Sequence, residues 1–326
     1  MRGREVIECD CNENYLDRGA RGQFCIDLTE TRYQDIINGV RSGPIYAYSP
    51  NNHGERCPPV DFDSSNKDDG SSCGVGNPCS PATGNKFQSE TDISANLSFV
   101  RYYNSRNLID LGLGKGWRST YQKRLAVRDN ITFTLVSEKG RGERWSKVTG
   151  IWIGDADSDV KVESTSTGYI LSKQNGSVDE YSMFGRLISE TDTNGNQTVY
   201  GYNSDDQLII VTNHYGQSLA FAYDANDHLE TVTDSNGTVY KYQYDANDNL
   251  RTVIYPDSTL SDNDNPTRGY HYDDTNYPSH LTGITDESGD RYATWAYNAD
   301  GKAIMTQHAE TTNSSAQEKF ALDYQD

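Results

Sequence analysis

Side chains capable of acid, base or nucleophilic chemistry are present, but no motif gathers them. The six histidines stand at positions 53, 214, 228, 271, 280 and 308. None of them lies in an H-E-x-x-H zinc motif or beside a G-x-S-x-G nucleophile elbow. The glycine-rich run at 112–116 lacks the spacing of a phosphate-binding loop and predicts a turn before Trp117. We interpret the histidines as ordinary surface residues, and we expect no catalytic residue and no cofactor.

Carboxylates are abundant, with 48 Asp and Glu residues, so their number alone says little about a paired-acid glycosidase. Asp224, Asp245 and Asp273 recur at one position of a repeat described below. A recurring aspartate is more simply a turn former that accepts hydrogen bonds from its own backbone than a unique catalytic acid. Together with neighbouring tyrosines, the same acids could instead bind a saccharide, and this alternative stays open.

Three alternating aspartates, Asp155, Asp157 and Asp159, resemble the start of a calcium loop. Val160 stands where an EF-hand has glycine, and Ser166 stands where it has glutamate. A solvated turn is the simpler interpretation. These aspartates are therefore a weak calcium candidate, and we expect no other metal site.

The elements that must position such residues are constrained first by composition. Leu, Ile, Val and Phe make up only about 18% of the 326 residues, and the net charge is −19, which together approach the composition of disordered chains. The 23 tyrosines oppose that interpretation if they are regularly spaced, because each buries a large ring. The acidic balance argues against nucleic acid as a partner. No apolar run approaches the length of a membrane helix, and residues 1–10 show no signal-peptide pattern.

Cysteine is confined to the start of the chain. The six cysteines are Cys9, Cys11, Cys25, Cys57, Cys73 and Cys79. An even number in a stretch rich in Pro and Gly predicts disulfides among them, and the sequence does not decide the pairing. A zinc site is the alternative, but no C-x-x-C pair is present and His53 is the only histidine nearby. We therefore expect a small Cys-rich, loop-rich segment at residues 1–75.

A 21-residue period dominates the second half of the chain. Three residue types share it: Tyr181, Tyr202, Tyr223 and Tyr244; Leu187, Leu208, Leu229 and Leu250; and Gly195, Gly216 and Gly237. Longer units start at Tyr244 and Tyr272, and a sixth unit starts at Tyr297. The extra residues of the longer units lie in turn-like stretches that tolerate insertion. A compact β-sandwich is the alternative, but it leaves the common period of three residue types unexplained.

Each unit has the pattern of an antiparallel β-hairpin. Asn194-Gly195 and Asn236-Gly237 predict tight type I′ turns, in which both central residues have positive φ. The flanking residues alternate with period 2, and each junction between units carries an aromatic residue, one spacer and the repeat tyrosine. We expect the aromatic residues of successive units to contact one another in rows, so that stacked hairpins bury what one hairpin cannot.

Upstream of the repeats, residues 76–180 predict further strands without the period. Strand patterns occur at 97–105 and 131–138, and Asn175-Gly176 marks another hairpin turn. We expect this leading β region to continue into the same sheet as the repeats. The predicted fold is therefore all-β, with antiparallel hairpin repeats at 181–326.

The repeats and the segments before them resemble a known family. The Tyr-Asp pairs that start at Tyr223, Tyr244 and Tyr272 resemble the YD repeats of Rhs-family proteins. Three upstream segments resemble the sequence that precedes the repeats in bacterial Rhs proteins: GNPCSPATGNKFQSETD at 76–92, FVRYYNS at 99–105 and LGKGWRSTY at 113–121. The stretch LTGITDESGDRYATWAYNADGKA at 281–303 is similar to one typical of their shells. The resemblance covers about residues 76–326, and residues 1–75 lie outside it.

The resemblance implies a β-sheet strip that spirals into a hollow shell around a C-terminal toxic polypeptide, used in competition between bacteria or at the cell surface. Its implied partners are the rest of the shell and a toxin domain, in the same or a companion chain, and its implied location is secreted or at the cell surface. Family shells are usually several times longer and end in an Asp-Pro self-cleavage motif, which this sequence lacks.

We therefore expect the chain to be the first part of a shell, truncated at its C-terminus, non-catalytic, and poorly soluble alone because its sheet ends in an unpaired strand. The alternative is a cell-surface repeat protein that binds carbohydrate. The direction of the tyrosine rings separates the two hypotheses. Rings that line a covered face favour the shell, whereas a solvent-exposed row favours the carbohydrate binder.

Overall fold

The computed structural model describes residue 80 and residues 83–155, 158–257, 264–308, 319–322 and 324. Every regular element in these residues is a β-strand, which confirms the predicted all-β class. None of them forms a helix with the length and apolarity of a membrane span. The predicted Cys-rich segment at 1–75 and all six cysteines lie outside the described residues.

Most of the strands belong to one antiparallel sheet, in which β8 to β22 follow one another in chain order. They are β8 (Val160–Ser164), β9 (Gly168–Lys173), β10 (Val178–Ser182), β11 (Leu187–Thr191), β12 (Gln197–Tyr202), β13 (Leu208–Thr212), β14 (Ser218–Tyr223), β15 (Leu229–Thr233), β16 (Val239–Tyr244), β17 (Leu250–Ile254), β18 (Thr267–His271), β19 (Gly283–Thr285), β20 (Arg291–Tyr297), β21 (Ala303–His308) and β22 (Lys319–Ala321). Because neighbours in sequence are neighbours in space, the sheet is a succession of hairpins, as the 21-residue period predicts.

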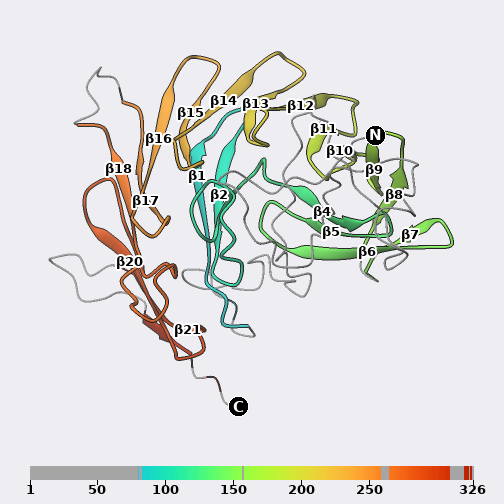
Figure 1. Cartoon of the computed structure of the whole chain (residues 1–326). Helices are drawn as coiled ribbons and strands as arrows, with labels where there is room; N and C mark the ends of the chain where they lie inside the picture. The colour runs from blue at the N-terminus through green and yellow to red at the C-terminus, as the bar shows by residue number, and fades with distance from the viewer. Residues whose placement is uncertain are drawn as a thin grey trace, which may run out of the picture.

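The repeat tyrosine and the repeat leucine lie opposite each other in the ladder. Tyr202 of β12 pairs with Leu208 of β13, and Tyr223 of β14 pairs with Leu229 of β15. A register shift marks a β-bulge beside these tyrosines, and the same shift recurs at three further repeats. Bulges bend a strand and increase its twist. Their regular recurrence accounts for the steady curvature of the sheet (Figure 1).

The hairpin turns differ from the predicted type I′. Gly195 has a φ of 82°, but Asn194 does not have positive φ. The N–H of Asp192 donates to the carbonyl of Asn196, and the N–H of Gly195 donates back to the carbonyl of Asp192. This is the longer connection in which a turn is followed by one left-handed glycine. The side chain of Asp192 selects it, since its Oδ1 accepts the N–H groups of Asn194 and Asn196.

The leading residues form two smaller sheets instead of continuing the repeat sheet throughout. One sheet contains β1 (Phe87–Ile93), β2 (Phe99–Asn104) and β3 (Trp117–Ser119). The other contains β4 (Arg124–Asp129), β5 (Thr132–Val136), β6 (Gly142–Val148) and β7 (Ile151–Ile153). Only β8–β10 join the repeat sheet, so the prediction of a single sheet was wrong for most of this region.

The physical reason is that β1 and β2 pack against a face of the repeat sheet and do not extend its edge. Figure 1 shows both strands in the middle of the molecule, with the repeat sheet curving around them. Buried residues of both layers, among them Phe99, Trp117, Leu229 and Leu250, belong to one hydrophobic core. We call residues 83–129 the leading segment, and we call the face of the repeat sheet that it covers the inner face.

Candidate functional site

The inner face carries one aromatic residue per junction between repeats. These residues are Tyr200, Phe221, Tyr242, Tyr270 and Trp295, and each is more than nine-tenths buried. Their ring contacts run to the leading segment: Phe99 lies 5.9 Å from Phe221 and 6.0 Å from Tyr242, and Trp117 lies 4.9 Å from Tyr270, between ring centroids. The prediction that these junction residues contact one another in a row was wrong. Equivalent positions of successive repeats are two strands apart, about 9.5 Å, which is too far for their rings to touch. The row therefore serves as a docking surface for the leading segment.

The repeat tyrosines join successive repeats through their hydroxyls, in a series that we call the tyrosine ladder. The hydroxyls donate to leucine carbonyls of the preceding unit: Tyr202 to Leu187 at 3.0 Å, Tyr223 to Leu208 at 3.0 Å, Tyr244 to Leu229 at 2.8 Å, Tyr272 to Leu250 at 3.0 Å and Tyr297 to Leu281 at 2.7 Å. Burial raises the pKa of Tyr202 and Tyr223, which keeps these phenols protonated as donors. The tyrosine and the leucine that recur with the same period are thus the two partners of one recurring hydrogen bond.

The aspartate of the Tyr-Asp pair shapes the turn that follows it. Oδ1 of Asp224 accepts the N–H groups of Asn226 and His228, at 2.8 and 2.9 Å. Asp245 makes the same two bonds one repeat later. Asp273 differs, because its carboxylate accepts from Arg291 at 3.1 Å. The interpretation of the recurring aspartates as turn formers is therefore confirmed for the first two.

A buried ion pair holds the leading segment on the inner face. The side chains of Asp92 in β1 and Arg101 in β2 are both fully buried and lie 2.6 Å apart. Asp92 also accepts hydrogen bonds from the hydroxyls of Tyr242 and Tyr255, at 2.9 and 3.0 Å, and Arg101 donates to the Tyr270 hydroxyl at 2.6 Å. Desolvation by burial is the largest single effect and would lower the pKa of Arg101, but Asp92, Tyr270 and Tyr255 together outweigh it, so the pKa is raised. Loss of any of these partners would destabilise the fold, because a buried charge that lacks its partner costs free energy.

The residue that precedes β1 and the remaining inward side chains of β1 are polar too. Lys86 Nζ lies 3.9 Å from the ring centroid of Trp295 and donates to Gln88 Oε1 at 3.0 Å. Gln88 donates to Glu90 at 2.7 Å, and Glu90 forms an ion pair with Arg268 of β18. We call this row, which ends at Asp92, the polar spine. Sequence reasoning missed it, because polar residues at alternate positions normally mark the solvent side of a strand.

The glycine-rich run before Trp117 is a turn, as predicted, and it also contacts the repeats. The carbonyl of Gly112 accepts the N–H of Leu229 at 2.6 Å, and the N–H of Lys115 donates to the carbonyl of Asp248 at 3.1 Å. An added Cβ at Gly114 would lie 2.6 Å from the Leu250 nitrogen. The backbones approach too closely there for any side chain, so glycine is required.

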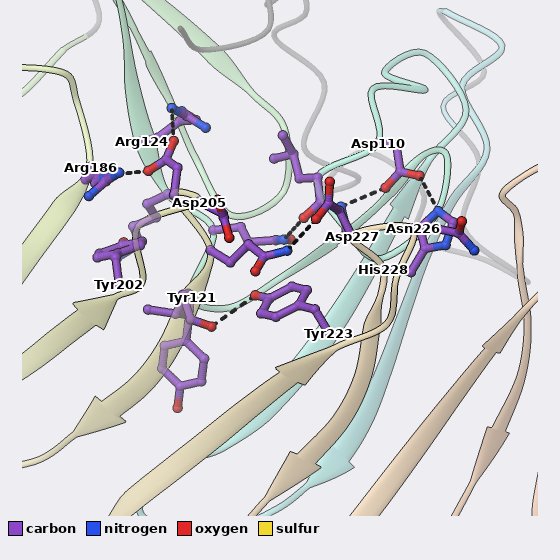
Figure 2. Close-up of a pocket in the computed structure, with 17 residues that line it drawn as sticks. Asp110, Tyr121, Arg124, Arg186, Tyr202, Asp205, Tyr223, Asn226, Asp227 and His228 are labelled. Carbon is purple, nitrogen blue, oxygen red and sulfur yellow. Dashed lines mark hydrogen bonds and ion pairs between the residues drawn. The ribbon is translucent and has the colours of Figure 1, made fainter. Parts of the chain in front are cut away.

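A cavity of about 330 Å³ lies where the leading segment meets the turns of the second and third repeats. Figure 2 shows Arg124 and Arg186 on one side of it and Asp110 with His228 on the other. Arg186 forms an ion pair with Asp206, and Arg124 Nη2 lies 3.9 Å from the same carboxylate. Burial is the main cause of the raised pKa of Asp110. Because these charges pair across the boundary, their arrangement is suited to joining the two layers.

The structure bears on two further predictions, that the histidines are surface residues and that Asp155, Asp157 and Asp159 could bind calcium. His228 and His280 are only 7% and 6% exposed, so the prediction of surface histidines was wrong for these two. His228 is buried because its ring stacks on Tyr244, at 4.4 Å between centroids. Asp157 lies outside the described residues, while Asp155 accepts a hydrogen bond from the N–H of Arg144. In the described part of the chain, no three His, Cys, Asp or Glu residues are grouped as metal ligands.

Comparison with known proteins gives two family matches. A family described as a domain of unknown function (DUF6531) matches residues 76–145, and the family described as RHS Repeat matches residues 181–217 and 223–260. No curated protein matches the chain.

Similar solved structures include a porin-like protein from Bacteroides uniformis, at 10% identity and a TM-score of 0.29, with 74% of this chain and 96% of that chain covered. A TcdB2-TccC3-Cdc42 complex is similar at 13% identity and a TM-score of 0.25 over 70% of this chain. The Tc holotoxin pore of Photorhabdus luminescens is similar at 14% identity and a TM-score of 0.24 over 72% of this chain. This chain covers only 17% of each of these two Tc chains.

Hairpins of one period, tied together by the tyrosine ladder, define an antiparallel β-sheet repeat protein. The RHS Repeat matches begin at Tyr181 and Tyr223, two of the residues that define the period. The chain contains RHS repeats at residues 181–217 and 223–260, and these repeats have a structural role in the sheet.

Proposed function

We propose that this chain is the opening part of an Rhs shell wall that encloses a C-terminal toxic polypeptide and helps to deliver it, in bacterial competition or at the cell surface. The tyrosine ladder carries the proposal. In five successive units the repeat tyrosine donates its hydroxyl to the preceding unit, so the recurring side chains build the wall itself. Side chains engaged in this way support a non-catalytic, structural function.

The curvature of the sheet gives further support. A bulge recurs at the repeat tyrosines, so each added repeat would bend the wall in the same direction. A strip that bends steadily can surround a volume. The partners in this proposal are further repeats of the shell and the enclosed polypeptide, encoded in the same or a companion chain, and the location is secreted or at the cell surface.

The carbohydrate-binding alternative has less support. It needs a row of aromatic faces open to solvent, whereas Tyr200, Phe221, Tyr242 and Tyr270 are buried under the leading segment. A glycan array on the purified chain tests it directly. Reproducible binding that is lost in a Tyr215→Ala variant would favour a surface binder, because Tyr215 is 71% exposed and the substitution removes its ring.

The enclosing function is tested on the gene and on the protein. We expect the reading frame to continue beyond the codon for Asp326 into further repeats and a divergent C-terminal domain. In the full-length protein this domain should resist a protease that rapidly digests the same domain expressed alone. A stop codon after Asp326 with no companion gene, or equal digestion in both forms, would overturn the proposal.

A further inference from the structure

A second series of contacts joins the repeats along one edge of the sheet, apart from the tyrosine ladder. Each contact starts at the residue immediately before a repeat leucine and reaches the turn of the next unit. The contacts are Arg186 to Asp206, Gln207 to Asp227, His228 to Asp248, Asn249 to the Pro278 carbonyl and His280 to the backbone at Gly301. Five successive junctions are thus bridged from the same position by different side chains.

The bridges have the geometry of genuine pairs. Arg186 and Asp206 form an ion pair with only 14% and 9% of their side chains exposed. Gln207 Nε2 donates to Asp227 Oδ1 at 3.0 Å, and Asn249 Nδ2 donates to the Pro278 carbonyl at 2.9 Å. His228 Nε2 lies 3.7 Å from Asp248 Oδ1, a pair that gains charge when the ring is protonated.

The backbone supplies an independent observation. Asp206, Asp227 and Asp248 have φ of 67°, 66° and 62°, a left-handed conformation that strains an L residue. Gly185 and Gly301 hold the same position of the first and last complete units, with φ of 87° and 70°. Glycine is therefore compatible with this turn, and pairing of the carboxylate with the preceding unit gives a reason for aspartate at the three inner positions.

We propose that these pairs are spacing bridges, which hold neighbouring repeats at a fixed distance. A donor before the repeat leucine recognises the left-handed aspartate of the next turn. The donors are Arg, Gln and His at successive junctions, so the aspartate is the common element of the three bridges. At the third junction His228 Nε2 also lies 3.5 Å from Asp110 Oδ2, so this bridge marks where the leading segment docks.

The proposal is tested by whether replacing a left-handed aspartate with glycine raises or lowers the Tm. Replacement of a left-handed aspartate by glycine relieves backbone strain, so an aspartate that acts only as a turn former should give way to glycine with no loss, or with a gain in Tm. We expect the opposite for the variants Asp206→Gly and Asp227→Gly, with Tm lowered by about 2–4 °C. Asp227→Asn keeps an acceptor oxygen for Gln207 and should restore Tm to within about 1 °C of the parent.

A double-mutant cycle separates the bridge from the general flexibility of glycine. In a Gln207→Ala background, the loss from Asp227→Gly should shrink or change sign, because the bridge is already absent. Asp205→Asn, at an exposed position in the same turn as Asp206, is the matched control for loss of a charge. A Tm that is unchanged or raised in both glycine variants, or losses that simply add in the cycle, would overturn the proposal. This measurement is independent of any enclosed polypeptide.

Discussion

The repeat sheet and the leading segment share one buried boundary, but they use different kinds of side chain there. The repeat sheet presents the same leucines and aromatic residues at every unit, as Leu187, Leu229 and Leu250 illustrate. The leading segment presents the polar spine, whose members are in order a cation, a neutral amide and two carboxylates. A repetitive surface alone would allow β1 to slide by one unit. The unique charges of the spine fit one register, which is how a regular sheet acquires a defined starting point.

The largest expected effect comes from high pH, which acts on both sides of the boundary. Burial raises the pKa of Tyr103 in the leading segment and of Tyr200, Tyr242 and Tyr270 on the inner face. Above about pH 10 the unfolded chain therefore loses phenolic protons that the folded chain retains, so the free energy of unfolding falls as pH rises. The slope is about 1.4 kcal/mol per pH unit for each such tyrosine.

We expect cooperative unfolding in this range, with phenolate absorbance at 295 nm and loss of the circular dichroism signal at one midpoint. If the buried tyrosines ionise well before the fold is lost, the inner face is open to solvent and the boundary is looser than the contacts indicate. Coincident transitions in 0.1 M and 0.5 M salt would show that burial, and not surface charge, controls the midpoint.

Asp92→Ala should break the polar spine without altering a repeat. The substitution leaves Arg101 buried without its carboxylate and removes an acceptor from two tyrosine hydroxyls. The free energy of unfolding should fall by about 3–5 kcal/mol, measured by urea denaturation.

Two variants show whether charge pairing causes that loss. Asp205→Ala removes an exposed carboxylate and should change stability by less than about 0.5 kcal/mol. Asp92→Leu combined with Arg101→Met removes both buried charges and should recover much of the loss. A loss below about 1 kcal/mol for Asp92→Ala would contradict the assigned role of the spine.

The contribution of the repeat sheet is tested by replacing its repeat leucines with alanine, one at a time. Leu187→Ala, Leu229→Ala and Leu250→Ala each remove a side chain that is at most 3% exposed. Each should lower the free energy of unfolding by about 2–4 kcal/mol, and by similar amounts, because the three sites are equivalent. Ile209→Ala, at a position 39% exposed, should cost less than about 1 kcal/mol. If the free energy of unfolding fell by very different amounts in the three variants, the repeats would not contribute equally to stability.

The same contrast explains what could be predicted from the sequence. The period placed Tyr202, Leu208 and their equivalents correctly, because every unit buries the same positions and the pattern is reinforced with each repeat. The polar spine could not be found in this way. Gln88, Glu90 and Asp92 alternate as a solvent-facing strand would, and only the tyrosine and arginine groups that approach from distant residues allow their burial.

The turn type and the ring contacts were predicted wrongly for a related reason. An Asn-Gly pair is compatible with more than one hairpin loop, and the side chain of Asp192, two residues earlier, selects the longer one. The spacing in sequence gave the aromatic row but not its partners. Those partners come from Phe99, Tyr121 and Trp117, which lie about 100 residues or more before several of the rings they contact.

The smallest effect is expected for a single bond of the tyrosine ladder. Tyr223→Phe removes the hydroxyl that donates to Leu208 O at 3.0 Å and keeps the ring. The free energy of unfolding should fall by about 1 kcal/mol, because one partly buried hydrogen bond is lost and a carbonyl is left without its donor. Tyr215→Phe is the matched control, since that ring is 71% exposed, and it should leave stability unchanged.

Repeating the change at Tyr244 sharpens the comparison between the two regions. Its hydroxyl donates to Leu229 O at 2.8 Å and also lies 3.2 Å from the Gly112 carbonyl of the leading segment. Tyr244→Phe should therefore cost more than Tyr223→Phe, and hydrogen exchange should rise at the Leu229 N–H, which donates to the same glycine carbonyl. Equal losses at both tyrosines, with no change in exchange at Leu229, would mean that the ladder stabilises the repeats but does not help to hold the leading segment.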